Sequence, residues 1–411
     1  MKYGLIGEKL GHSFSKTVHS KIADYEYELF EIAKNDLDAF MKSRDFCGIN
    51  VTIPYKQTVI PYLDFISDEA KEIGAVNTIV NKNGKLYGYN TDFFGLKSLI
   101  EKNNIEIYGK TTLVLGSGGT SKTANAVLKS LGAKEVFTVS RSGGEGYITY
   151  EEAYSKDVQV IINTTPVGMY PKTDEQPIKL DNFNNLEAVV DVVYNPLKTK
   201  LIIDAQSRGI KAAGGLYMLY AQAVKAAEIF SDNEIKADVF EKILKEKQNL
   251  VLIGMPSCGK TTLGKMLAEE YGKEFVDTDE EIIKKAGITI PEIFEKYGEE
   301  YFRNLESEVI RELSVKQLLV IATGGGAVLR KENIDALKQN GKIIFIDRPL
   351  DMLITTDDRP LSSSREALEE RYFERYSLYC FASDVRINAD GDINTNLKRV
   401  KEGFLNENFS Y

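Results

Sequence analysis

Two glycine-rich turns, each lying directly between a β-type run and a helical run, constrain the fold of this chain most strongly. The first turn, residues 116–119, follows the apolar run 112–115, and the second, residues 254–261, follows the apolar run 250–253. A strand, a glycine turn and a helix in this order present backbone N–H groups to phosphate. The two turns are about 140 residues apart, so we expect two nucleotide-binding domains.

Length and composition agree with a multidomain enzyme. The chain has 411 residues, 43% of them apolar and 27% charged, which is typical of globular proteins with buried cores. Its net charge of -9 argues against a nucleic-acid-binding surface, because neutralising phosphates needs an excess of Lys and Arg. No uncharged apolar run reaches the ~18 residues of a membrane span, and the apolar run at the start is too short for a signal peptide. The three scattered cysteines form no zinc spacing, so we expect a reduced, cytoplasmic setting.

The chain before residue 116 alternates short β-type runs with helical runs, which predicts an α/β fold. Strands are expected over residues 3–6, 27–32 and 48–53, and helices over 35–43 and 93–102. A further helix is expected over 233–245, where apolar residues recur at helical spacing, and we place a domain boundary near 247.

The expected domains follow from this boundary. The first domain is residues 1–247, with a substrate lobe over about 1–100 and 215–247 and a Rossmann-like NADP lobe over about 101–214. The second is residues 248–411, a P-loop domain with a parallel sheet.

The residues after the second β-type run of the nucleotide lobe indicate which nucleotide binds. This run, 136–139, ends at Ser140 and Arg141, where an NAD site would place an acidic residue for the ribose hydroxyl. A guanidinium pairs with phosphate oxygens, so Arg141 favours the 2′-phosphate of NADP. The alternative interpretation is a solvated surface arginine.

Polar clusters at the expected element ends, where small-ligand sites form, give a family resemblance. They lie at residues 11–15, 50–56, 74–78 and 90–92, and further motifs follow at 163–169, 191–196 and 214–219. In this order, over residues 1–247, they resemble shikimate dehydrogenase. The resemblance implies NADPH-dependent reduction of 3-dehydroshikimate to shikimate.

The resemblance also implies roles for single residues. Lys56 matches the catalytic lysine and Asp92 its partner, a pair that can deliver a proton to a carbonyl oxygen. Without the resemblance, Lys56 is interpreted as a solvated lysine and Asp92 as a helix N-cap. Substrate contacts are implied for Ser13, Ser15, Thr52, Asn77, Tyr194 and Gln222. NADP contacts are implied for Gly116, Gly118, Gly119, Ser140, Arg141, Thr165, Gly215 and Met218. Gly144 stands where the family often has a second basic residue, which predicts a weaker hold on the 2′-phosphate. His19 is expected to be structural.

The second glycine turn meets the complete P-loop pattern G-x-x-x-x-G-K-[ST]. Its backbone amides, in the loop that Gly254 and Gly259 shape, are expected to wrap the phosphates of ATP. Lys260 is expected to neutralise the β- and γ-phosphates, and Thr261 to hold Mg²⁺.

The two carboxylates of Asp277 and Asp279 follow the P-loop unit and share one side of an extended segment. One could organise Mg²⁺ and the other hold a substrate hydroxyl; the alternative is a helix cap. Further motifs lie at 302–303, 323–326, 358–361 and 375–379. Over about 249–390 this order resembles shikimate kinase.

The kinase resemblance implies a site for shikimate. Asp277 would assist Mg²⁺, and Asp279 would receive the proton of the 3-hydroxyl. Arg359 would be the lid arginine that reaches the ATP phosphates. Shikimate contacts are implied for Asp279, Arg303, Gly325, Gly326 and Arg375. The two arginines among them would clamp the carboxylate, which suits bidentate guanidinium pairing.

The combined prediction is a bifunctional enzyme acting on small molecules, without a nucleic-acid or membrane partner and with its oligomeric state open. It would make shikimate with NADPH and phosphorylate it with MgATP, two consecutive steps. One rival keeps the folds but takes quinate, or another small polyol for the kinase. Another rival is a sensor with one inactive half, against which the presence of Lys56, Asp92, Lys260, Asp279 and Arg359 argues.

Overall fold

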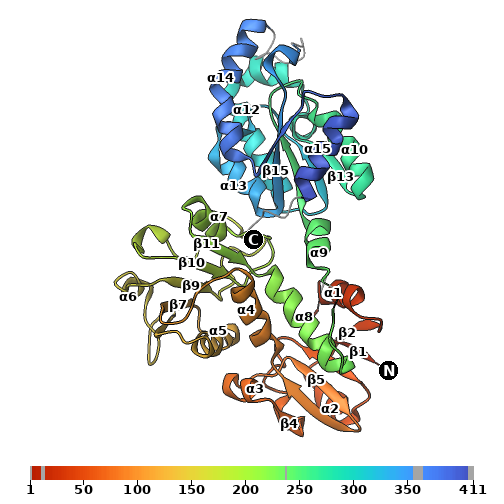
Figure 1. The fold of residues 1–411 in the computed structure, drawn as a ribbon, viewed down its shortest axis with the longest axis vertical. Coiled ribbons are helices and arrows are strands. Elements are labelled where there is room, and N and C mark those ends of the chain that lie inside the picture. The colour runs from red at the N-terminus through yellow and green to blue at the C-terminus, as the bar shows by residue number, and fades with distance from the viewer. Residues whose placement is uncertain (1, 11–13, 237, 355–363, 406–411) are drawn as a thin grey trace. The chain divides into compact units, whose positions relative to one another are not determined.

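The computed structural model describes residues 2–10, 14–236, 238–354 and 364–405. Contacts between residues divide the chain into two compact units, one within residues 1–195 and 204–243, the other within 196–203 and 244–409. Both units consist of sheets covered by helices (Figure 1), which confirms the predicted α/β class. No helix in the described ranges is long and apolar enough to cross a membrane.

The first sheet of unit 1 is mixed and has six strands in the order β2-β1-β3-β5-β6-β4. Strand β1 pairs in parallel with β2 and β3, whereas β5 runs antiparallel to both β3 and β6. Its centre is apolar, and Ile6, Ile49 and Ile79 are fully buried. The strands are β1 Tyr3–Gly7, β2 Tyr27–Glu31, β3 Gly48–Val51, β4 Phe65–Ile66, β5 Thr78–Lys82 and β6 Lys85–Tyr89. The helices of this part are α1 Phe14–Ile22, α2 Leu37–Ser43, η1 Ile60–Tyr62, α3 Asp68–Ile73 and α4 Thr91–Lys102.

The second sheet of unit 1 is entirely parallel, with five strands in the order β11-β10-β9-β7-β8. Every residue of β7, β9 and β10 is buried, as expected of parallel strands with helices on both faces. The strands are β7 Thr111–Leu115, β8 Glu135–Val139, β9 Val160–Asn163, β10 Ala188–Asp191 and β11 Lys211–Gly214. The helices are α5 Gly119–Ser130, α6 Tyr150–Ala153, η2 Leu180–Asn182 and α8 Leu216–Ser231. Helix α7, Lys200–Ser207, contains the division between the two units, after Ile203.

Helices α4 and α8 lie side by side in unit 1 (Figure 1). Their closest approach is at Gly95, where a Cβ would stand 2.6 Å from the carbonyl oxygen of Met218. Because glycine has no side chain, the two helices can touch at this position. Asp92 on α4 and Gln222 on α8 line the same cavity.

Unit 2 contains one parallel sheet with the strand order β13-β14-β12-β15-β16. Strand β12 is central, so the loop after it lies where the strand order reverses, a common place for ligands. Helices α10 and α15 lie on one face, and α12, α13 and α14 on the other (Figure 1). The strands are β12 Asn249–Ile253, β13 Glu274–Asp277, β14 Leu319–Ala322, β15 Gly341–Asp347 and β16 Val385–Asn388. The helices are α10 Lys260–Tyr271, α11 Thr278–Ala286, α12 Ile290–Ser314, η3 Ala327–Leu329, α13 Lys331–Asn340, η4 Leu350–Met352, α14 Arg365–Ala382 and α15 Ile393–Leu405.

The helix expected over 233–245 starts later than predicted. It is α9, Phe240–Lys247, and the chain before it is not helical where the structure describes it. The Asp238 side chain accepts a hydrogen bond from the Phe240 N–H at 3.1 Å, a local bond that competes with an earlier helical start. The strand expected to reach residue 53 ends at Val51. The other expected elements are confirmed to within a few residues.

Candidate functional site

Unit 1 encloses a cavity of about 320 Å³ beside the end of β3. It brings together predicted residues from α1, α4, α8 and the loops after β3, before β5 and after β10, which are far apart in the sequence. They are Ser15, Thr52, Lys56, Asn77, Asp92, Tyr194 and Gln222. Ser13 lies outside the described residues.

An ion pair lies in this cavity. Lys56 Nζ donates to Asp92 Oδ2 at 2.6 Å, and the side chains are 30% and 16% exposed, respectively. Asn90, not Asp92, caps α4, because its side chain accepts a hydrogen bond from the Phe93 N–H at 3.2 Å. The alternative interpretation of Asp92 as an N-cap is therefore wrong, and its carboxylate holds the ammonium. An ammonium fixed in this way can donate a proton to a ligand in the cavity.

Hydrogen bonds fix the orientation of the Asn77 amide. Its Oδ1 accepts from the Thr91 N–H at 2.6 Å and from the hydroxyls of Thr78 and Thr91 at 3.2 Å each. Its Nδ2 donates to Gln222 Oε1 at 3.2 Å. Gln222 therefore keeps its own NH₂ for a ligand. Thr78 and Thr91 were not predicted to belong to the site. The sequence feature that could have identified them is their position, Thr78 directly after Asn77 and Thr91 directly before Asp92.

His19 also lines this cavity, one helical turn after Ser15 on α1. Its Nδ1 is 2.7 Å from the Tyr25 hydroxyl, and its ring stacks on Tyr27 with centroids 3.9 Å apart. Burial lowers the pKa of His19 to about 3, although a hydrogen bond to Asn50 favours the charged form. The imidazole is thus neutral near pH 7. His19 was expected to be structural, but it also lines the cavity. The sequence feature that could have identified it is its spacing of four residues from Ser15 on a helix.

The first glycine turn provides open backbone at the start of α5. Gly116 has φ 107°, where a Cβ would stand 3.0 Å from Thr164 Oγ1. At Gly118 and Gly119 a Cβ would meet nothing within 4 Å. The turn therefore leaves room for phosphate oxygens at a helix N-terminus, the geometry that dinucleotides use.

The predicted NADP-selecting residues follow β8 as expected. Ser140 Oγ donates to the Gly143 carbonyl oxygen at 3.0 Å, and Gly143 and Gly144 turn the chain with φ 62° and 122°. Arg141 is exposed beside this turn. Its guanidinium is therefore accessible to a phosphate.

The other predicted cofactor contacts lie at the ends of strands β9 and β11. Thr165 Oγ1 donates to Asn163 Oδ1 at 2.7 Å. A Cβ at Gly215 would collide with the carbonyl oxygen of Val192, so only glycine fits there. Met218, in the first turn of α8, is 8% exposed.

Unit 2 encloses a second cavity, of about 240 Å³, under the P-loop. Gly254 and Gly259 adopt φ 145° and 100°, and a Cβ at Gly254 would stand 2.7 Å from the Ile346 carbonyl oxygen. Lys260 Nζ donates to the carbonyl oxygens of Gly254 and Met255 at 2.9 Å each. The ammonium is thus held against the backbone of the loop and lines the cavity, from where a P-loop lysine can reach phosphate oxygens. The predicted residues that line this cavity are Gly259, Lys260, Thr261, Asp277, Asp279 and Gly325.

A hydroxyl and a carboxylate meet next to the P-loop. Thr261 Oγ1 donates to Asp277 Oδ2 at 2.9 Å, and Asp277 Oδ1 accepts from the Asp279 N–H at 3.0 Å. Asp277 therefore caps α11, as the alternative interpretation held, and still presents oxygen to Thr261. These oxygen donors fit Mg²⁺, which takes few protein ligands and keeps phosphate oxygens and water. Within the described ranges no three acidic, His or Cys side chains cluster as a metal site.

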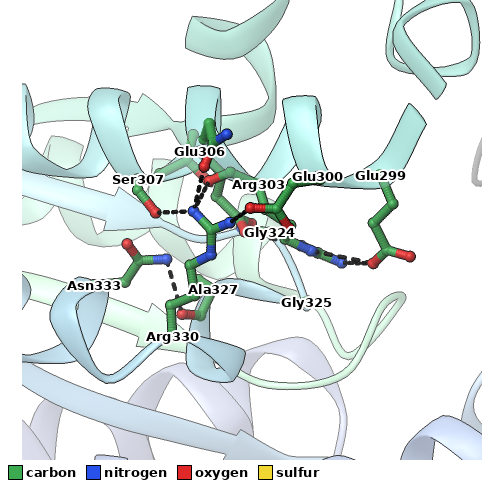
Figure 2. Close-up of polar contacts among 12 residues, drawn as sticks. Glu299, Glu300, Arg303, Glu306, Ser307, Gly324, Gly325, Ala327, Arg330 and Asn333 are labelled. Carbon is green, nitrogen blue, oxygen red and sulfur yellow. Dashed lines mark hydrogen bonds and ion pairs between the residues drawn. The ribbon is translucent and has the colours of Figure 1, made fainter. Parts of the chain in front are cut away.

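Arg303 on α12 is held by two glutamates (Figure 2). Its NH1 donates to Glu306 Oε2 at 2.8 Å, and its Nε and NH2 donate to Glu299 Oε1 at 3.2 and 3.0 Å. Glu306 is fully buried, its Oε1 accepts no hydrogen bond, and burial raises its pKa against the opposing effect of Arg303. Glu306 was not predicted, although its spacing of three from Arg303 on a helix is the signal that identifies it.

Arg330 supports the same helix (Figure 2). Its guanidinium donates to the Arg303 carbonyl oxygen at 3.0 Å and to the side chains of Asn304, Ser307 and Glu300. Arg330 therefore joins α12 to the end of η3, the short helix that follows the glycine loop 324–326.

Arg375 on α14, like Arg303 and Gly326, is not in the lining of this cavity but adjoins it through the glycine loop 324–326. Its NH1 donates to the Gly325 carbonyl oxygen at 3.3 Å, and its buried Nε makes no hydrogen bond. Arg375 Nε is 3.6 Å from Glu374 Oε2, and neither this donor nor Glu306 Oε1 makes a hydrogen bond, so the two fit a ligand with a carboxylate and a hydroxyl. Arg359 lies outside the described residues.

Comparison with known proteins gives a separate match for each part of the chain. The model of the shikimate dehydrogenase substrate binding domain matches residues 5–79, and the shikimate kinase model matches residues 256–403. The shikimate dehydrogenase (NADP(+)) of Clostridium beijerinckii is 42% identical over 250 residues, covering 57% of this chain and 93% of the relative.

Solved structures agree over the N-terminal part. A chorismate mutase/shikimate 5-dehydrogenase fusion protein from Clostridium acetobutylicum is 38% identical with TM-score 0.55, covering 59% of this chain and 94% of that one. A Thermus thermophilus shikimate 5-dehydrogenase, solved with NADP(H) and shikimate, is 28% identical with TM-score 0.53, covering 57% and 95%. The chain therefore belongs to the shikimate dehydrogenase family in its N-terminal part and carries a shikimate kinase domain after it, which makes it a bifunctional enzyme of the shikimate pathway.

Proposed function

We propose that the first unit reduces 3-dehydroshikimate to shikimate with NADPH and that the second phosphorylates the 3-hydroxyl of shikimate with MgATP. The observation that carries the proposal is that one chain forms two cavities with complementary chemistry. One contains a lysine–aspartate pair surrounded by amide and hydroxyl groups, and the other contains a P-loop and Gly325, next to which two buried arginines lie.

In the reduction, Lys56 is the proton donor. NADPH, when bound along 116–119 and Arg141, supplies a hydride to the carbonyl carbon. Lys56 delivers a proton to the carbonyl oxygen, so the carbonyl becomes a hydroxyl, and Asp92 keeps the ammonium in line. Asn77 and Gln222 hold ring hydroxyls, and Ser15 holds the carboxylate. The roles of Ser13, Thr52 and Tyr194 remain as the resemblance predicts.

In the phosphorylation, positioning and charge neutralisation dominate. Asp279 would accept the proton of the 3-hydroxyl as the hydroxyl oxygen bonds to the γ-phosphorus of ATP and the bond from that phosphorus to ADP breaks, and Lys260 would stabilise the phosphate charge. Thr261 and Asp277 are the residues that hold Mg²⁺, which neutralises phosphate charge when bound. Arg303 and Arg375 bind the shikimate carboxylate beside Gly325 and Gly326.

The test is a product analysis of the full chain. Given 3-dehydroshikimate, NADPH and MgATP, we expect NADP⁺, ADP and shikimate 3-phosphate; omitting ATP should stop the reaction at shikimate. Parallel assays with NADH and with quinate measure cofactor and substrate preference. Absence of either shikimate formation or its ATP-dependent phosphorylation would reject the proposal for the corresponding unit.

A further inference from the structure

Two donors from a single helix hold the carbonyl oxygen of Gly325. Arg375 NH1 donates to it at 3.3 Å and the Tyr379 hydroxyl at 2.5 Å. Arg375 and Tyr379 are four residues apart on α14, so both side chains face the glycine loop 324–326. The tyrosine bond is the shorter of the two, and Tyr379 is only 1% exposed. The glycine loop is thus anchored to α14 through one peptide group.

The other side of this peptide faces α12. A Cβ on Gly326 would overlap the Arg303 guanidinium, so this guanidinium packs directly on the backbone. The peptide 325–326 therefore lies between Arg303 and Arg375, the two arginines proposed to bind the carboxylate. In a trans peptide the C=O and N–H point in opposite directions. With the Gly325 carbonyl turned to Tyr379, the Gly326 N–H points away from α14.

We propose that Tyr379 is a positioning residue for the kinase substrate, holding the Gly325 carbonyl so that the Gly326 N–H is presented to the shikimate carboxylate. This inference rests on the proposed function of the second unit. Arg375 has a second task, because its Nε, 3.6 Å from Glu374 Oε2, makes no hydrogen bond and can donate one to the carboxylate. The Tyr379 ring stacks on Phe345 with centroids 5.1 Å apart, and its hydroxyl contacts the Arg375 side chain and donates to the Gly325 carbonyl oxygen.

The hydroxyl is suited to this task at any working pH. Burial raises the pKa of Tyr379 well above its usual range, so it remains a donor. A purely structural role would make the same hydrogen bond, but its loss would weaken the unit as a whole. A positioning role predicts instead a loss confined to shikimate binding.

The experiment compares Tyr379→Phe with Tyr376→Phe in the full chain. Both variants keep the ring and lose one hydroxyl from α14, but the Tyr376 hydroxyl donates to Asp347 Oδ2 at 3.2 Å, not to the glycine loop. KM for shikimate, KM for ATP and kcat are measured by ADP release, and circular dichroism verifies that both variants are folded.

We expect Tyr379→Phe to raise KM for shikimate about three- to tenfold, the effect of one lost hydrogen bond, with KM for ATP and kcat within twofold of the unmodified chain. Tyr376→Phe should leave KM for shikimate within twofold. An unchanged shikimate KM in Tyr379→Phe, or an equal rise in both KM values, would overturn the positioning role alone. Failure of the unmodified chain to release ADP with shikimate would overturn the proposed function and, with it, this inference.

Discussion

At the scale of single residues, the two proposed reactions depend on two lysines, one in each cavity. Lys56 Nζ is 2.6 Å from Asp92 Oδ2 in the first unit, and Lys260 Nζ lies in the P-loop of the second. In Lys56→Met the proton donor is lost but most of the side-chain length is kept. We expect kcat for 3-dehydroshikimate reduction, measured by NADPH oxidation, to fall about 10²- to 10⁴-fold.

The kinase activity is the internal control for this variant. ADP release with shikimate should be unchanged in Lys56→Met, whereas Lys260→Met should lose ADP release and keep NADPH oxidation. A Lys56→Met enzyme that keeps more than a tenth of the reductase rate would remove Lys56 from its assigned role.

His19 predicts a pH dependence of stability. Its pKa is about 3 in the folded chain and 6.5 when exposed. Below pH 6.5 the unfolded chain therefore takes up a proton that the folded chain does not, so the free energy of unfolding falls as the pH falls. The loss is about 1.4 kcal/mol per pH unit, or about 2 kcal/mol between pH 6.5 and 5.

The matched variant is His19→Phe, which keeps a ring against Tyr27 but cannot titrate. Urea unfolding of the full chain at pH 6.5 and pH 5 measures the change in stability of each protein. The unmodified chain should lose about 2 kcal/mol more than the variant over this interval. Equal losses would show that His19 is not held neutral in the fold.

At the scale of secondary-structure elements, α12 and the glycine loop meet at Gly326. A Cβ there would overlap the Arg303 guanidinium, so Gly326→Ala should displace this guanidinium from the glycine loop 324–326. Displacements of about 1 Å in a substrate site cost up to about a hundredfold, and we expect KM for shikimate to rise about ten- to a hundredfold. ADP-release assays at varied shikimate measure this, and an unchanged KM would contradict the assigned geometry.

The start of α12 provides a comparison in the same helix. Thr289 and Glu292 form a capping box there, and a non-helical residue, Gly298 with φ 80°, separates this first segment from Arg303. Thr289→Ala should therefore cost about 1 kcal/mol of stability, seen by thermal melting, but leave KM for shikimate within twofold. A rise in KM as large as that of Gly326→Ala would show that the kink does not separate the two segments.

At the scale of the whole molecule, the two cavities are independent in construction. The residues lining each cavity belong to a single unit. A mixture of full-length Lys56→Met and Lys260→Met should therefore still convert 3-dehydroshikimate to shikimate 3-phosphate, with shikimate passing through solution. A mixture that forms no shikimate 3-phosphate would show that a reaction needs both intact units in one chain.

Fusion could still raise the local concentration of shikimate near the second cavity. The lag before ADP appears, compared between the unmodified chain and this mixture, measures that effect, and equal lags would reject it. The domain boundary near 247 is likewise still a prediction. Helix α9, Phe240–Lys247, ends at this position, and β12 begins at Asn249.

Local patterns in the sequence were sufficient to predict the secondary-structure elements around both glycine turns and the class of chemistry. The succession of a strand, a glycine turn and a helix is set by residues close together in the sequence. The strand β7 with its turn and the strand β12 with its P-loop could therefore be predicted before the fold was known. The identity of the substrates came from the order of motifs that resemble two families. Such predictions fail where a side chain competes with the helix for backbone hydrogen bonds. The Asp238 side chain binds the Phe240 N–H in this way, and α9 starts later than predicted.

Which polar groups meet depends on the folded arrangement of the chain. The bond from Asn77 to Gln222 spans 145 residues and that from Tyr379 to Gly325 spans 54, and neither follows from local pattern. The buried atoms of Glu306 and Arg375 that make no hydrogen bond are identified only when burial is known. The physical reason is that propensity and glycine turns act over a few residues, whereas burial and hydrogen bonding between distant segments depend on the path of the whole chain.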